Sequence, residues 1–460
     1  MHLESNNNNI ITIVSFFDDN YGDMLIKNSF ECILKTVLDN LGQKGADFRR
    51  MPLREVDEEL IKSSSLVCFS GGGLFGLSYL TFYPYVEKIL EIAEDSNVPV
   101  VFSSMGINNM DYREGDDDKF IKMLGHKCIK AISVREQIDW FRKYNKREDL
   151  SVAEVCDPAM WSRYMIKPLN EPKQQNDKKL VGINVVRGGL FADNGRTWDR
   201  SKFFEYVDAL ISIADKNGYD YFLYTNGSIG DNKALKAYVE NNNLDETHYS
   251  YVNSTEELLN IINRCDFICA VRLHSAIIAA SFEKPVINLV WNDKIPFFYR
   301  AINKENMIFE EDAISIPEIE KIINEKIGKQ DSVDRSYQES LYQWLFGVMK
   351  GIYSVAEESE PYDFEEVANK VYEFYQDSRL IYKLEDYSVK TQKLTYNYYK
   401  MQSLAVETKK ELKHTIKENE KLQRKNEKLN NENDKLKARL NKILNHPVIK
   451  TGRKIKSIFK

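Results

Sequence analysis

Residues 265–289 read CDFICAVRLHSAIIAASFEKPVINL, and this stretch decides the fold that we expect. An apolar, β-branched run at 267–271 is typical of a buried strand in a parallel sheet. The small and apolar residues at 276–280 then predict a helix packed on that sheet, and the run at 286–290 predicts the next strand. This order of elements is the repeating unit of an open, doubly wound α/β sheet.

Polar side chains occupy the junction between this strand and this helix. Arg272 and His274 follow the strand, with Leu273 between them and Ser275 after them. Open α/β sheets bind ligands at such an edge, where free backbone N–H groups attract anions. An arginine can hold a phosphate or carboxylate with two parallel hydrogen bonds, and a histidine beside an anion can deliver a proton. The junction therefore predicts a site for an anionic substrate, and a surface ion pair or a helix cap is the simpler alternative.

The composition narrows the class of protein. The 460 residues have room for two or three domains, at roughly 100–200 residues each. A formal net charge of −6 does not suggest binding to nucleic acid. The six cysteines are scattered without a C-x-x-C pair, which predicts reduced core thiols in a cytoplasmic protein and no zinc or redox site. We also expect neither a signal peptide nor a membrane span.

The first part of the chain repeats the order of strand, polar turn and helix. A strand at 10–16 is followed by Asn20, Gly22 and Asp23, and then by a helical pattern at 24–41. All three fall on the ligand side of the predicted sheet, where we count Asn20 and Gly22 as candidate substrate-binding residues and Asp23 as a candidate catalytic residue. A helix cap is the simpler role for Asp23.

A glycine-rich turn follows the next predicted strand. The apolar run at 65–69 ends in Gly71, Gly72 and Gly73, whose backbone amides can approach an anionic ligand closely. A tight turn without a ligand is the alternative. Three further strands are predicted, at 98–103, 131–134 and 152–155. Together these elements predict a doubly wound domain over 10–165.

A second α/β series follows a polar segment at 166–179, which we interpret as a linker. It begins with an apolar strand that ends at Arg187 and includes the central stretch, and we assign it to residues 180–350. Two doubly wound Rossmann-like domains in series, meeting across a cleft, form a GT-B-like architecture.

The chain then becomes helical and highly charged, and we expect a coiled coil over 377–445. The d positions of its heptads are Leu422, Leu429, Leu436 and Ile443, and the a positions are Leu412, Asn419, Asn426, Asn433 and Leu440. Asparagine at a favours a parallel two-stranded coil, although each one lowers stability, so we expect a homodimer. A single charged helix is the alternative.

The tail at 446–460 is basic and amphipathic. It carries Lys450, Arg453, Lys454, Lys456 and Lys460 and no acidic residue, with apolar residues between them. Such a segment suits peripheral contact with an anionic membrane surface, and a solvated end is the alternative.

The motifs together resemble the polysaccharide pyruvyl transferase family. They are NYGD at 20–23, SGGG at 70–73, SVRE at 133–136, DPA at 157–159, GINVVR at 182–187 and RLHS at 272–275, followed by Pro285. They occur in the order of the family and span roughly residues 10–345.

This resemblance implies a GT-B-like fold that transfers pyruvate from phosphoenolpyruvate to sugar hydroxyls as a ketal in cell-envelope or exopolysaccharide synthesis. In the family, the positions matching Arg187, Arg272, Leu273 and His274 are associated with binding phosphoenolpyruvate. We expect the second domain to hold the donor and the first to hold a saccharide acceptor, either free or lipid-linked at the inner face of the membrane. We further expect His274 to be the general acid and Asp23 the base, with no metal or cofactor beside the donor.

Two other functions are consistent with the same pattern. A GT-B glycosyltransferase that uses a nucleotide sugar would need a glutamate for the donor ribose, and no clear candidate lies near the RLHS motif. A non-catalytic scaffold, in which the coiled coil organises a glycan-assembly complex, would not need Arg187, Arg272 and His274.

Overall fold

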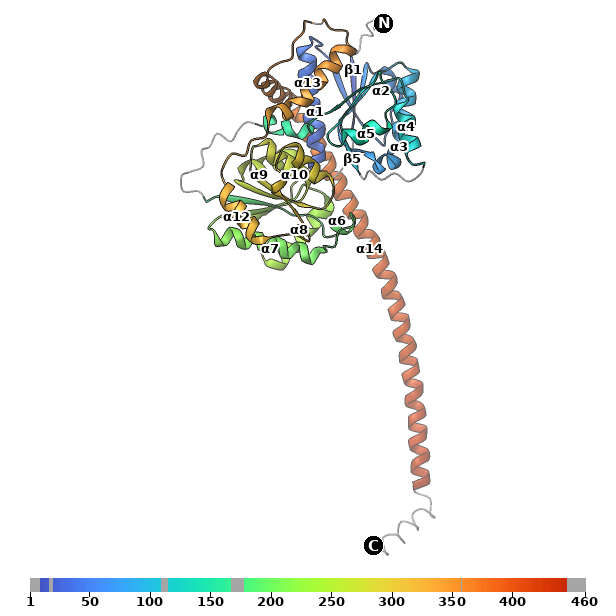
Figure 1. Cartoon of the computed structure of the whole chain (residues 1–460). Helices are drawn as coiled ribbons and strands as arrows, with labels where there is room; N and C mark the ends of the chain where they lie inside the picture. The colour runs from blue at the N-terminus through green and yellow to red at the C-terminus, as the bar shows by residue number, and fades with distance from the viewer. Residues whose placement is uncertain (1–8, 16–19, 109–114, 167–177, 357, 445–460) are drawn as a thin grey trace, which may run out of the picture. The chain divides into compact units, whose positions relative to one another are not determined.

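The computed structural model describes residues 9–15, 20–108, 115–166, 178–356 and 358–444 (Figure 1). The chain divides into two compact units, Met1–Lys390 and Thr391–Lys460. The first unit contains two parallel sheets with helices on both faces, and the described part of the second unit is helical.

Among the described residues, the first sheet has seven strands in the order β2-β1-β3-β5-β6-β7, with β4 paired to β5, and all pairings are parallel. Its strands are β1 (Ile10–Ser15), β2 (Asp47–Pro52), β3 (Leu66–Phe69), β4 (Gly72–Gly76), β5 (Val100–Asn108), β6 (Ile129–Val134) and β7 (Ser151–Glu154). Its helices are α1 (Tyr21–Asn40), α2 (Glu58–Ser63), α3 (Leu77–Asp95), α4 (Asp117–Leu124), α5 (Ile138–Tyr144) and the 3-10 helix η1 (Pro158–Met165).

Alternation along the strands explains why helices cover both faces of this sheet. In β3, Leu66 and Cys68 join the apolar core that contains α1, whereas Val67 and Phe69 join the core that contains α3. Successive strand residues point to opposite faces, so an unbroken apolar run buries both.

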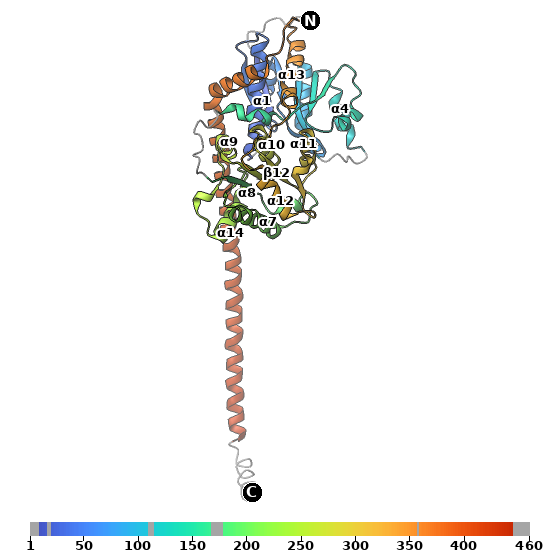
Figure 2. The same cartoon turned by 60° about the vertical axis from the view of Figure 1, so that its left-hand side comes forward.

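The second sheet has six described strands, all parallel, in the order β10-β9-β8-β11-β12-β13. They are β8 (Leu180–Asn184), β9 (Asp220–Tyr224), β10 (Tyr249–Ser250), β11 (Phe267–Ala270), β12 (Val286–Val290) and β13 (Ile308–Glu310). The helices are α6 (Gly189–Ala192), α7 (Arg200–Lys216), α8 (Ile229–Asn242), η2 (Glu246–His248), α9 (Thr255–Arg264), α10 (Leu273–Ser281), α11 (Lys294–Ala301), η3 (Glu305–Met307) and α12 (Ile316–Lys326). Figures 1 and 2 place α9 and α10 on one face of this sheet and α7 and α12 on the other.

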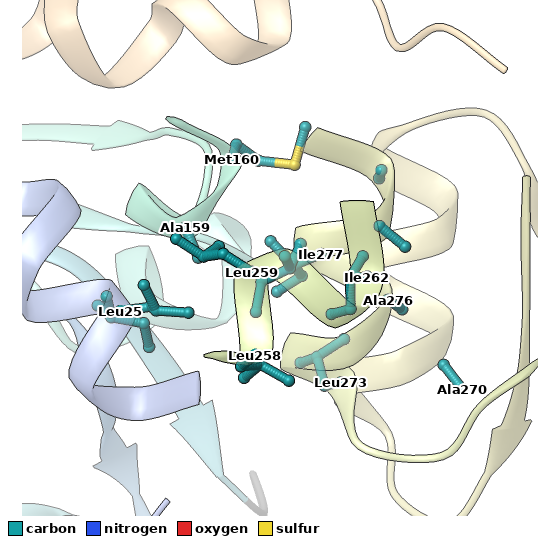
Figure 3. Packing of buried hydrophobic residues seen from close by; sticks show 14 of the residues in the cluster. Leu25, Ala159, Met160, Leu258, Leu259, Ile262, Ala270, Leu273, Ala276 and Ile277 are labelled. Atoms are coloured by element: carbon teal, nitrogen blue, oxygen red, sulfur yellow. The ribbon is translucent and has the colours of Figure 1, made fainter. Parts of the chain in front are cut away.

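The two sheets share one continuous apolar core. Figure 3 shows Leu25 of α1 beside Leu258 and Leu259 of α9, within a cluster that also contains Ala159 of η1 and Ile277 of α10. This packing holds the carboxyl edges of the two sheets close to each other.

Two helices, α13 and α14, do not follow the expected domain boundaries. Helix α13 (Arg335–Ile352) falls mostly within the range expected for the second domain but packs on the first. Asn40 donates to the Tyr342 hydroxyl at 2.7 Å, and the Cys156 N–H donates to the Ser340 hydroxyl at 2.9 Å. Its buried residues, including Leu341, belong to the same apolar core as α1, so its apolar stripe packs against the first domain.

Helix α14 (Phe364–Leu444) begins before the predicted coiled coil, and residues up to 390 belong to the first unit. Tyr375 and Tyr382 are buried there, so one face of this part of the helix packs into the core of the first unit. Farther along, Leu422, Leu429 and Leu436 are exposed, and the pairing of two such helices stays a prediction.

Smaller differences concern the glycine turn and the segments outside the described residues. Gly72 and Gly73 belong to the short strand β4 rather than to a turn. Residues 167–177 of the predicted linker and the whole predicted tail at 446–460 lie outside the described residues. None of the helices within the described ranges is long and apolar enough to span a membrane. All six cysteines are buried and free, as predicted for core thiols.

Candidate active site

A cavity of about 320 Å³ lies between the carboxyl edges of the two sheets. Residues from both sheets line it, which agrees with ligand binding at the ends of parallel strands. The predicted site residues in its wall are Asn20, Asp23, Gly71, Gly72, Gly73, Arg272, Leu273 and His274.

Asp23 and His274 meet across the two domains. Asn20 caps α1 by accepting a hydrogen bond from the Gly22 N–H at 2.9 Å, which leaves Asp23 in the first turn. The His274 Nδ1 atom lies 3.2 Å from the Asp23 Oδ1 atom. A Cβ atom on Gly22 would lie 2.6 Å from the Cβ of His274, so this close approach requires glycine. Gly22 therefore shapes the site without lining the cavity.

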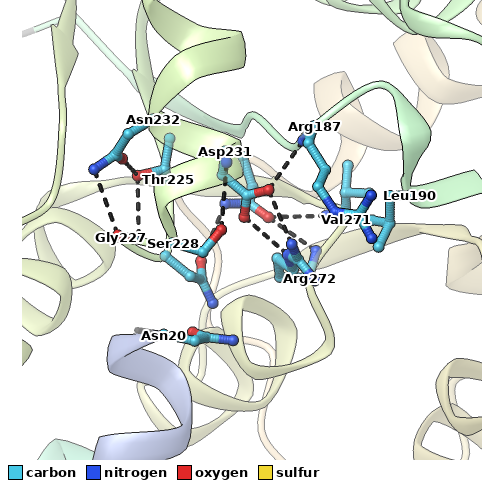
Figure 4. Close-up of polar contacts among 12 residues, drawn as sticks. Asn20, Arg187, Leu190, Thr225, Gly227, Ser228, Asp231, Asn232, Val271 and Arg272 are labelled. Atoms are coloured by element: carbon cyan, nitrogen blue, oxygen red, sulfur yellow. Dashed lines mark hydrogen bonds and ion pairs between the residues drawn. The ribbon is translucent and has the colours of Figure 1, made fainter. Parts of the chain in front are cut away.

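Arg272 is held against the buried carboxylate of Asp231, which lies in the first turn of α8 (Figure 4). Its Nε and one terminal nitrogen each donate to Asp231 at 2.9 Å. The Arg272 backbone N–H donates to the Asn184 side chain, also at 2.9 Å. This two-pronged contact fixes the guanidinium at the cavity wall, a geometry that lysine cannot reproduce.

Arg135 lines the cavity and Asp157 lies beside it, although neither was among the residues predicted from the sequence. Arg135 follows β6 and donates to Glu136 at 3.1 Å and to Asp157 from a terminal nitrogen. Asp157 Oδ2 lies 3.9 Å from His274 Nε2. Arg135 stands at a strand end, as Arg272 does, so the same rule applied to SVRE would have found it.

Lys294, the first residue of α11, is another cation in the cavity wall that was not predicted from the sequence. A Cβ atom on Gly73 would lie 2.5 Å from the Lys294 ammonium and 2.4 Å from the Asn108 amide nitrogen. Glycine at this position thus makes space for both side chains. Lys294 follows no strand directly, and no sequence pattern marked it.

Burial sets the protonation of the central groups. It raises the pKa of Asp23 to about 6, against the opposing effect of Arg135 and other cations. It lowers the pKa of His274 to about 3, and the positive charge of Arg135 and Lys294 adds to this fall. Burial likewise lowers the pKa of Lys294 to about 8, with Arg135 as the next cause. At neutral pH, Asp23 is therefore largely ionised and His274 is neutral, and a negative charge placed beside His274 would raise its pKa.

The family of the chain follows from its match to a family model. The model described as polysaccharide pyruvyl transferase matches residues 20–293, more than half of the chain. The chain belongs to the polysaccharide pyruvyl transferase family. The matched segment contains Asp23, Arg135, Arg272 and His274, so most of the cavity wall lies in the family domain.

Solved structures of other proteins share the two-sheet fold. The complex of S. aureus MnaA with UDP is 12% identical, covers 77% of this chain and 99% of its own, and has a TM-score of 0.50. The UDP-GlcNAc 2-epimerase of Methanocaldococcus jannaschii is 10% identical over 74% of this chain and 100% of its own, with a TM-score of 0.48. The first similarity supports a GT-B-like fold. No curated protein sequence matches the chain.

Two residues of the predicted site lie elsewhere in this pyruvyl transferase family member. Arg187 does not line the cavity: its guanidinium pairs with Asp193 at 2.5 Å, beside a separate hollow of about 540 Å³. Only its backbone reaches the site, through a 2.9 Å hydrogen bond to Asp231. Ser275 is fully buried and bonds to the Tyr224 hydroxyl, so it supports packing. Arg187, which the family resemblance associates with the donor, therefore lies outside the cavity that Arg272 lines.

Proposed function

We propose that this protein transfers the pyruvyl group of phosphoenolpyruvate to two hydroxyls of a saccharide, forming a ketal. The observation that carries the proposal is the convergence of Arg135, Arg272 and Lys294 on one cavity beside the Asp23–His274 pair. Phosphoenolpyruvate carries a phosphate and a carboxylate, and a cluster of buried cations is suited to such a polyanion.

In this proposal Lys294 has the donor-binding role that the family resemblance implies for Arg187. The Arg272 and Arg135 guanidiniums are held by Asp231 and Asp157, so they present fixed positive charge to the cavity. The Lys294 ammonium has three donors and can turn them toward the phosphate or the carboxylate.

Asp23 and His274 move the protons. His274, loaded with a proton when the donor binds, protonates the methylene carbon and makes the adjacent carbon electrophilic. A sugar hydroxyl adds to that carbon and passes its proton to Asp23, which lies 3.2 Å from the imidazole and can return it. A second hydroxyl then displaces the phosphate. Two C–O bonds form, the C–O bond to phosphate breaks, and the two hydroxyl protons end on the new methyl group and the departing phosphate.

The test is incubation of purified full-length protein with phosphoenolpyruvate and free, nucleotide-linked or lipid-linked saccharides. Release of phosphate together with the mass gain of a pyruvyl ketal on the saccharide is the expected result. Turnover of a UDP-sugar without phosphoenolpyruvate would instead establish the glycosyltransferase alternative. No turnover of either donor with any acceptor would favour the non-catalytic scaffold.

We further propose that the protein is a homodimer whose basic tails contact an anionic membrane at the cytoplasmic face, near a lipid-linked acceptor. Each Lys or Arg near such a surface contributes about 1 kcal/mol, and two tails on one dimer bind together. Deletion of 446–460 should release the protein from anionic liposomes without changing its turnover of a free saccharide. Continued sedimentation of the truncated protein with the liposomes would remove the tail from the proposal.

A further inference from the structure

The first part of α14 has two different faces. Tyr375, Tyr382 and Val389 follow each other at intervals of seven residues and are buried in the first unit. Leu380 and Leu384 lie on the same stretch of helix but are 70% and 59% exposed. Large exposed aliphatic side chains at a spacing of four form an apolar stripe on a helix.

Polar contacts on the buried side fix how the helix is rotated about its axis. Glu385 pairs with Lys27 of α1 at 2.6 Å and with Arg50 at 2.7 Å. Asp386 accepts hydrogen bonds from the backbone and hydroxyl of Thr255 at 3.1 and 3.0 Å, at the start of α9. The helix is thereby bound to α1 and β2 of the first domain and to α9 of the second, and Leu380 and Leu384 face outward.

The outward face has the same heptad register as the distal part of α14. Counting back from Leu422 by sevens places Leu380 at a d position and Leu384 at an a position. The intervening d positions hold Tyr387, Leu394, Met401, Thr408 and Thr415, and the intervening a positions hold Thr391, Tyr398, Ala405 and Leu412. One heptad earlier the same positions hold Glu373 and Asp377, which are charged. The largely apolar register therefore starts at residue 380.

We propose that a second copy of this chain covers Leu380 and Leu384, in a parallel, in-register helix pair whose seam starts on the folded unit. This places the start of the interface proposed above well before the leucines at 422–443 from which the coiled coil was first predicted. A parallel pair sets Asn419, Asn426 and Asn433 opposite their own copies, which is the arrangement that buried asparagines favour. The same register brings the two copies of Leu380 face to face.

Disulfide cross-linking of the full-length chain tests the proposal. The six native cysteines are buried, so mild oxidation acts on an introduced surface cysteine. In a parallel pair, d positions approach within the roughly 5.5–6 Å Cα separation that a disulfide prefers. Leu380→Cys should give a covalent dimer. Glu365→Cys, whose wild-type side chain is equally exposed at 70% on the same helix before the seam, should stay monomeric in denaturing gels.

The variant Leu422→Cys distinguishes a seam that starts at residue 380 from one that is confined to the distal part of the helix. If it forms the dimer while Leu380→Cys behaves like the control, the seam is confined to the distal helix and the proposal is overturned. If neither variant cross-links, the helices do not pair in a parallel register and the proposal also fails.

A second measurement does not depend on oxidation. Leu380→Lys together with Leu384→Lys should raise the dimer dissociation constant at least tenfold in sedimentation equilibrium, because two charges enter the seam of each helix. Glu365→Lys also adds two positive charge units per chain, but at a position outside the seam. It should leave the dimer dissociation constant within about threefold of wild type. Equal dissociation constants for the two variants would contradict the proposal.

Discussion

The carboxyl ends of β11 and β8 look alike in sequence but differ in the structure. Each apolar strand is soon followed by an arginine, Arg272 or Arg187. The Arg272 side chain is 16% exposed and pairs with a fully buried Asp231. The Arg187 side chain is 41% exposed and pairs with Asp193, which is 57% exposed. A strand end thus identifies the ligand edge of a sheet, whereas depth and partner decide which side chain belongs to the site.

Asp231 explains the difference between the two arginines. It accepts two hydrogen bonds from the Arg272 guanidinium but only a backbone hydrogen bond from Arg187. One carboxylate therefore fixes the side chain of the first and leaves the side chain of the second to the surface.

The largest effect is expected at His274, which follows Arg272 at the β11 end. His274→Ala should lower kcat by about 10²–10⁴-fold, the range for loss of a general acid. Phosphate release from phosphoenolpyruvate with a saccharide acceptor measures the loss. Near-normal turnover would remove the proton-transfer role and leave the cavity as an anion site only.

Arg272→Lys is expected to remove most activity. The variant keeps the charge but loses the bidentate contact with Asp231, and hydrogen bonds to charged groups contribute about 1.5–3 kcal/mol each, or roughly 10–150-fold. The assay is kcat/KM for phosphoenolpyruvate, with circular dichroism to verify folding. An unchanged kcat/KM would exclude Arg272 from the donor site.

The plot of kcat/KM against pH should fall on both the acid and the alkaline side, because of two groups that line the cavity. Asp23 must be ionised to act as a base, so kcat/KM should fall about tenfold per pH unit below its pKa of about 6. Lys294 must be protonated to hold an anion, so kcat/KM should fall as pH rises above its pKa of about 8. Because arginine stays charged, Lys294→Arg should abolish the alkaline limb. A limb that persists in this variant would belong to another group.

Arg187→Lys should have the smallest effect. Its ion pair with Asp193 is exposed, and such pairs contribute about 0–1 kcal/mol, so kcat/KM should stay within about threefold to fivefold of wild type. The pH profile should keep both limbs. A loss as large as that of Arg272→Lys would show that the Arg187 side chain also contacts the donor.

The sequence alone was enough for the local features of the fold. The apolar run at 267–271 and the small residues after Ser275 predicted β11 and α10, because strand and helix periods are written into neighbouring residues. The same logic placed Asn20, Asp23 and His274 at element ends, and the structure brings all three into one cavity wall.

Tertiary structure alone decided which of these residues meet, and how far each is buried. Asp231 holds Arg272 from 41 residues away, and Lys294 enters the cavity through the space beside Gly73. Neither contact has a local signature, since a side chain's direction and desolvation depend on segments distant in the chain. Tertiary structure also decided that α13 packs on the first sheet and which face of α14 is buried. The sequence period predicts an apolar stripe on a helix, but its packing partners determine where that stripe is buried.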